Sequence, residues 1–236
     1  MHGRPPMKLP IYFKQLELGP MQNYVYLLGD PNTHEAAVVD AAWDVDAIVR
    51  TAESDGYRIT KDLVTHFHPD HLGGSLMGHQ IIGAAELVAR VPAKVYIHKA
   101  ELPFVHRVTG LSQSDLVAVE GGDEVQVGEL KVTFLHTPGH TPGSQCFLVG
   151  NALVSGDTLF IGSCGRVDLP GSNPEDMYRS LTQVLAALPD ETLLFPGHNY
   201  ADRPRSTIGD EKRTNMMLRF PNLHDFLAMM GGPQGG

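Results

Sequence analysis

The chain has 236 residues, of which 42% are hydrophobic, and its 27 acidic and 18 basic residues give a formal net charge of −9. A chain of this length and apolar content buries one core, so we expect a single domain. The acidic balance, with scattered basic residues, argues against a nucleic-acid partner. No apolar run is long enough to predict a membrane-spanning segment or a membrane partner.

The two ends of the chain differ in composition from the rest. Residues 1–10 are polar and proline-rich, and we expect them to be disordered or vector-derived; residues 11–230 form the expected domain, and the glycine-rich residues 231–236 form a flexible tail. Cys146 and Cys164 are too few for a disulfide framework. No export signal is recognisable, so we expect a cytoplasmic protein.

Short runs rich in β-branched residues alternate with helical patterns along the chain, which predicts a mixed α/β fold. Helices are expected over Asp44–Glu53, with Asp44 as N-cap, over Asn173–Leu188, which opens with proline and acids, and over Met216–Met230. The expected strands are Tyr24–Leu28, Ala36–Val39, Leu63–Thr65, Lys94–Ile97, Val125–Val127, Leu130–Leu135, Gln145–Val149, Ala152–Val154 and Thr192–Phe195.

Three imidazoles and a carboxylate lie within residues 66–71, directly after one of these strands. In an extended loop, side chains two positions apart point to the same side, so His66 and His68 can hold one ion. Asp70 and His71 follow the bend set by Pro69 and face a neighbouring position. This pattern predicts a metal site rather than an ordinary polar loop.

Three more candidate ligands follow downstream, each after an apolar run and beside a glycine: His140, Asp157 and His198. Glycine permits a sharp turn and a close backbone approach, which can bring ligands from distant segments to one sheet edge. Zinc accepts imidazole and carboxylate ligands, and a carboxylate can bridge two cations. The complete set is large enough for two divalent ions, with zinc expected and iron or a mixed centre as alternatives.

A His-x-His-x-Asp-His motif followed by a lone His, Asp and His in that order resembles the metallo-β-lactamase superfamily. The resemblance extends from about residue 11 to about residue 215, and it implies an αββα sandwich with the site at one sheet edge. It also implies that His66, His68 and His140 hold the first metal, that Asp70, His71 and His198 hold the second, and that Asp157 bridges them.

Within that superfamily the chain is most similar to the glyoxalase II-like branch, which includes hydroxyacylglutathione hydrolases and persulfide dioxygenases. The resemblance implies that Arg166 and Tyr200 contact the thiol part of the substrate. Asp168 stands where glyoxalase II usually has an aromatic residue, and most of that family's basic C-terminal region is missing. The segments that carry the likeness are Gly156–Phe160, Cys164–Arg166 and Gly197–Tyr200.

The expected activity is metal-dependent hydrolysis of a thioester of glutathione or a similar thiol. A hydroxide held between two metal ions is nucleophilic at neutral pH, and a thiolate leaves without a strong general acid. Asp157 bridges the ions in this interpretation, and Asp70 can assist the leaving group through a bound water. Asp40, which ends a strand, either supports a ligand as an outer acceptor or caps a turn.

Several alternatives remain open on the sequence. His66, His140 and Asp157 would also form the two-histidine, one-carboxylate face of a ferrous persulfide dioxygenase. A lactonase or β-lactamase-like hydrolase is less favoured, and a metal-binding scaffold without catalysis least of all, because purely structural zinc sites are normally closed by four protein ligands. A monomer and a homodimer are both compatible with the sequence.

Overall fold

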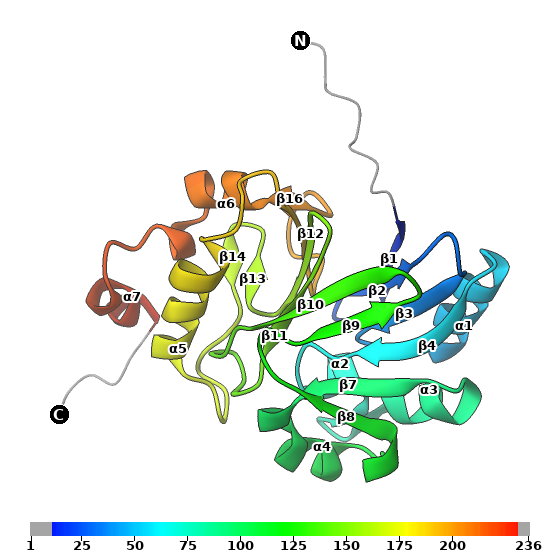
Figure 1. Cartoon of the computed structure of the whole chain (residues 1–236). Coiled ribbons are helices and arrows are strands. Elements are labelled where there is room, and N and C mark those ends of the chain that lie inside the picture. Colours follow the sequence, from blue (N-terminus) through cyan, green and yellow to red (C-terminus); the bar gives the residue numbers. More distant parts are fainter. Residues whose placement is uncertain (1–10, 231–236) are drawn as a thin grey trace.

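The computed structural model describes residues 11–230, and the expectations for residues 1–10 and 231–236 lie outside them. Two six-stranded sheets pack face to face, and helices cover the outer face of each (Figure 1). This is the expected αββα sandwich, with both sheets belonging to a single domain. In the described part of the chain, none of the helices has the length and apolar character needed to cross a membrane.

The first sheet is built from the N-terminal half of the chain. Its strands are β1 (Tyr12–Leu18), β2 (Asn23–Gly29), β3 (Glu35–Val39), β4 (Arg58–Leu63), β7 (Lys94–His98) and β8 (Leu116–Val119), in that spatial order. The first three strands are antiparallel, whereas β3, β4, β7 and β8 run parallel. The carboxyl ends of the parallel strands therefore meet at one edge, where connecting loops can bring functional side chains together.

The second sheet has the spatial order β16-β15-β12-β11-β10-β9. Its members are β9 (Glu124–Val127), β10 (Leu130–His136), β11 (Gln145–Val149), β12 (Ala152–Gly156), β15 (Leu193–Pro196) and β16 (Ser206–Thr207). Two hairpins accompany the sheets, one of β5 (Gly74–Leu76) with β6 (His79–Ile81) and one of β13 (Leu159–Phe160) with β14 (Ser163–Cys164).

The main core lies between the sheets and is rich in aromatic and β-branched side chains. Phe134 and Phe147 meet edge to face with their ring centroids 5.3 Å apart, and both are fully buried. Tyr26 is also fully buried, and its hydroxyl donates to the Pro196 carbonyl at 2.5 Å. Burial of each such side chain contributes about 1.5–3 kcal/mol, so this layer fixes the two sheets against each other.

Separate apolar clusters join the helices to the outer sheet faces. The α-helices are α1 (Val45–Ser54), α2 (Pro69–Leu72), α3 (Ala84–Arg90), α4 (Leu102–Val108), α5 (Pro174–Arg179), α6 (Ile208–Thr214) and α7 (Leu223–Met230). Figure 1 shows α1 beside the first sheet and α5 and α7 beyond the second. The remaining short helices are η1 (Lys99–Glu101), η2 (Gln113–Asp115), η3 (Ser180–Leu185) and η4 (Met216–Leu218).

The predicted elements are largely recovered, with informative differences. Asp44 caps α1, since its side chain accepts from the Ala47 N–H at 2.8 Å. The expected helix over Asn173–Leu188 begins as α5 and widens into the π-helical turn η3. The single closing helix expected over Met216–Met230 is wrong: it is broken into η4 and α7 around Pro221, because proline disfavours helical backbone in the residue before it.

Candidate metal centre

The seven candidate ligands follow the ends of strands or lie in the first turn of a short helix. The ligands that follow strands all lie at the same edge of the sandwich, in the gap between the two sheets. His66 and His68 follow β4, Asp70 and His71 lie in α2, His140 follows β10, Asp157 follows β12 and His198 follows β15. Pro69 occupies the first position of α2, where its missing N–H costs no hydrogen bond.

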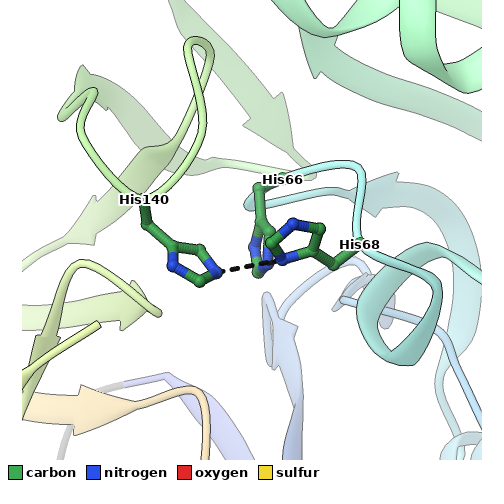
Figure 2. Close-up of side chains that lie close together, drawn as sticks. All are labelled: His66, His68 and His140. Carbon is green, nitrogen blue, oxygen red and sulfur yellow. Dashed lines mark hydrogen bonds between the residues drawn. The ribbon is translucent and has the colours of Figure 1, made fainter. Parts of the chain in front are cut away.

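His66, His68 and His140 form the first ligand group (Figure 2). His68 Nδ1 lies 3.0 Å from His66 Nε2 and 3.0 Å from His140 Nε2. When the imidazoles are neutral, too few N–H protons are available for each of these three converging ring nitrogens to take part in a good hydrogen bond. A divalent cation satisfies all three lone pairs, so the donor set fits a zinc or iron ion.

Asp70, His71 and His198 form the second ligand group. His71 Nε2 lies 3.2 Å from His198 Nε2 and 3.3 Å from Asp70 Oδ2. Burial lowers the pKa of His71, but Asp157 and Asp70 outweigh that effect and raise it well above its ordinary value. The carboxylates therefore favour a positive charge at this point, which a second cation would supply.

Asp157 lies between the two groups. Its Oδ2 is 3.5 Å from His140 Nε2 in the first group and 3.4 Å from His198 Nε2 in the second. Its Oδ1 is buried and receives no hydrogen bond from the described residues, although His71 Nε2 lies 3.3 Å away. An unsatisfied buried carboxylate oxygen is costly, and this one fits a ligand that bridges two ions.

The protonation states suit metal binding. Burial and the neighbouring imidazoles lower the pKa of His68 to about 4 and that of His66 well below its ordinary value. Burial acts to raise the pKa of Asp157, but His71 and His198 hold it well below its usual range. At neutral pH His66 and His68 therefore offer neutral imidazoles beside an ionised carboxylate, the forms that coordinate metals.

Asp40 supports one imidazole from each ligand group. His71 Nδ1 donates to Asp40 Oδ2 at 2.8 Å. The Thr65 hydroxyl donates to the same oxygen at 2.7 Å and receives a hydrogen bond from His66 Nδ1 at 3.0 Å. These bonds hold Nδ1 of both histidines away from the centre and direct Nε2 toward it, which is the usual effect of an outer carboxylate on a metal ligand.

Backbone carbonyl groups orient two further imidazoles in the same way. His140 Nδ1 donates to the Arg166 carbonyl at 2.8 Å, and His198 Nδ1 donates to the Met21 carbonyl at 2.9 Å. Each bond leaves the opposite nitrogen, Nε2, as the acceptor that faces the centre. Arg166 thus touches the site through its main chain as well as flanking it.

Asn23 is a contributor that the sequence did not indicate. Its side-chain amide donates to Asp70 Oδ2 and to the Asp70 carbonyl, each at 3.0 Å. Its own carbonyl accepts from Trp43 Nε1 at 2.9 Å. Asn23 begins a strand and belongs to none of the histidine motifs, so only the pairing of distant segments reveals its place.

The two candidate substrate residues lie at the exposed rim of the centre. The Tyr200 ring stacks on the His198 ring with centroids 4.6 Å apart, and 57% of the tyrosine is exposed. The Arg166 guanidinium is exposed and pairs with Asp168 through two hydrogen bonds of 2.8 and 2.9 Å. Both side chains are therefore accessible from solvent.

Comparison with known proteins identifies relatives of this chain. Residues 18–198 match the family model of the metallo-β-lactamase superfamily. A hydroxyacylglutathione hydrolase from Maricaulis maris is 37% identical over 76% of this chain, and the chain spans only 63% of that enzyme's length. A human mitochondrial persulfide dioxygenase, ETHE1, is 28% identical over 94% of this chain and 81% of its own. The crystal structure of ETHE1 from Myxococcus xanthus superposes with a TM-score of 0.81 at 33% identity, covering 95% of this chain and 92% of that one.

Proposed function

Because this chain belongs to the metallo-β-lactamase superfamily, whose members are mostly metal-dependent enzymes, we propose that it is a two-metal hydrolase that cleaves a thioester of glutathione or a similar small thiol. The observation that carries the proposal is the pair of ligand groups joined by Asp157. Two groups of three ligands, each beside a shared carboxylate, suit a binuclear centre with open positions. A relative named hydroxyacylglutathione hydrolase supports the substrate class.

In this proposal, one set of residues binds the metal ions and another set binds the substrate. Two divalent ions held there would supply a Lewis acid for the carbonyl under attack and a bound water whose pKa is about 7. The first group and the second group would hold these ions, and Asp40, directly and through Thr65, orients His71 and His66 with Nε2 toward the centre. Arg166 and Tyr200 at the rim are placed to bind the thiol part of the substrate. A thiolate leaves without a strong general acid, and the proposed mechanism assigns none.

A persulfide dioxygenase is the second candidate, and two observations favour it. His140 Nε2 lies 3.5 Å from Asp157 Oδ2, and His66 shares one ligand group with His140 and another with Asp157. Together these residues would supply the two-histidine, one-carboxylate set of the kind that holds ferrous iron. Similarity to named persulfide dioxygenases also covers 94–95% of this chain. We place this activity second because it leaves Asp70, His71 and His198 without a direct role.

Two assays on the reconstituted protein separate these functions. Protein loaded with zinc, and separately with ferrous iron under anaerobic conditions, is mixed with a hydroxyacyl thioester of glutathione, and thiol release is followed with a thiol-reactive dye. Oxygen uptake is then measured with glutathione persulfide. We expect thiol release that requires metal and proceeds without oxygen. Iron-dependent oxygen uptake, with no thiol release, would replace the hydrolase by the dioxygenase.

Arg166→Ala is expected to raise KM for the glutathione thioester about tenfold while kcat changes by less than twofold. A lost hydrogen bond to a charged group corresponds to about 1.5–3 kcal/mol, and the existing pair with Asp168 reduces that cost. Anchoring that is equal in ground and transition states affects KM rather than kcat. Steady-state kinetics check this, with Arg179→Ala, another exposed arginine paired with carboxylates, as the control. An unchanged KM would remove Arg166 from the substrate site.

A further inference from the structure

Glu101 is a fully buried carboxylate that lies outside both ligand groups. It ends the short helix η1, between β7 and α4. Its Oε2 accepts from the Phe67 backbone N–H at 2.8 Å, and its Oε1 accepts from the Gly143 backbone N–H at 2.5 Å. The two oxygens therefore connect two loops that are 76 positions apart in the chain (143 − 67).

Both of these loops supply ligands to the first group. Phe67 lies between His66 and His68, and Gly143 lies three residues after His140. Figure 2 shows the three imidazoles reaching the group from two separate loops. Glu101 thus contacts the main chain on either side of the gap that the first metal would fill, without contributing an atom to the metal.

The surrounding sequence is adapted to this contact. A Cβ added to Gly143 would lie 2.5 Å from Glu101 Cγ and 2.6 Å from its Oε1, so only glycine permits this approach without movement. Burial raises the pKa of Glu101, while hydrogen bonds from Phe67, Thr141 and Gly143 oppose the rise. Burying a carboxylate costs free energy, which its hydrogen-bond donors must offset. The presence of Glu101 here therefore indicates that the fold requires a hydrogen-bond acceptor at this position.

We propose that Glu101 is a positioning residue that sets the separation of the two loops of the first group and thereby its affinity for metal. The inference rests on the proposed two-metal function. Outer groups that orient metal ligands typically change metal affinity 10–100-fold when mutated. Here the orientation acts through the backbone at Phe67 and Gly143, so the effect is expected on one metal ion and not on the other.

Glu101→Gln tests this with little change in side-chain size. One end of the amide is an NH₂ group, which cannot accept from a backbone N–H, so one loop loses its acceptor. We expect one of the two zinc ions to bind about tenfold more weakly, in a titration of the full chain against a competing chromophoric chelator. The weakened ion should be the one that His140→Ala also weakens, whereas the ion weakened by His198→Ala should bind normally.

Glu120→Gln is the matched control, because this exposed carboxylate pairs with Lys99 close to Glu101 but contacts neither loop through its side chain. Circular dichroism of the metal-free proteins checks folding. If Glu101→Gln does not fold, Glu101→Asp, which keeps both oxygens but shortens the side chain, is expected to weaken the same ion. Unchanged affinity for both ions in a folded variant overturns the inference. A wild-type chain that binds fewer than two ions instead overturns the proposed function, so the two failures are distinguishable.

Discussion

Asp157→Ala is expected to reduce thioester hydrolysis roughly 1,000-fold or more and to weaken binding of both metal ions. Asp157 contacts both groups, through His140 in the first and through His198 and His71 in the second. Metal ions contribute several kcal/mol to stabilisation of the transition state, and each 1.36 kcal/mol corresponds to a factor of ten in rate. Metal analysis and steady-state kinetics on the same preparation check both halves of this result.

Asp190→Ala is the matched control for that experiment, because Asp190 is exposed, pairs with Lys212 and belongs to neither ligand group. It is expected to keep full activity and both ions. Full activity and two bound ions in the folded Asp157→Ala protein would contradict the assignment of Asp157 as the bridging ligand.

Removal of metal is expected to lower the melting temperature by roughly 10–20 °C. A ligand at 100 times its Kd stabilises the folded state by about 2.7 kcal/mol, so two such sites contribute about 5 kcal/mol. For a domain of 150–250 residues, each kcal/mol corresponds to about 2–4 °C. The metal-free protein is expected to be less stable because five imidazoles and two carboxylates converge at this centre. Asp157 Oδ1, in addition, has no hydrogen-bond donor in the described structure.

Differential scanning calorimetry of chelator-treated and zinc-reconstituted protein measures this shift. Magnesium serves as the control ion, since it prefers all-oxygen octahedral coordination and should restore little stability to an imidazole-rich site. Equal melting temperatures with and without zinc would contradict the presence of tight metal sites.

The candidate ligands could be identified from the sequence because they are contiguous or follow clear strand endings, whereas the assignment of His140 and His198 to separate groups was implied by the family resemblance. Pro69 bends the chain between two pairs of candidate ligands, His66 with His68 and Asp70 with His71. This bend is a local feature, so the separation of the two pairs could be predicted from the sequence. The predicted strands overlap observed ones for the same reason, since apolar β-branched runs are local signals. For Leu63–Thr65 the overlap is Leu63 alone, because β4 is mostly the preceding polar segment and ends there.

Features that depend on distant pairing could not be predicted. β1, with the sequence YFKQLEL, is an edge strand whose side chains are nearly all half-buried, so it lacks the alternation that identifies a strand. Asn23 and Glu101 reach the site by contacts with residues 47 and 42 positions away, respectively. Asp40 had two equal interpretations in the sequence, and its bond with His71 is visible only in three dimensions.

The number of zinc ions that bind to the metal-free wild-type chain tests most directly whether this centre holds two metal ions. Anaerobic titration against a chromophoric chelator, with total metal verified by elemental analysis, gives this number. A two-metal centre predicts two ions per chain, with hydrolysis of the glutathione thioester reaching its full rate only when both are bound. A single bound ion that supports the full rate, or no tight binding at all, would contradict it.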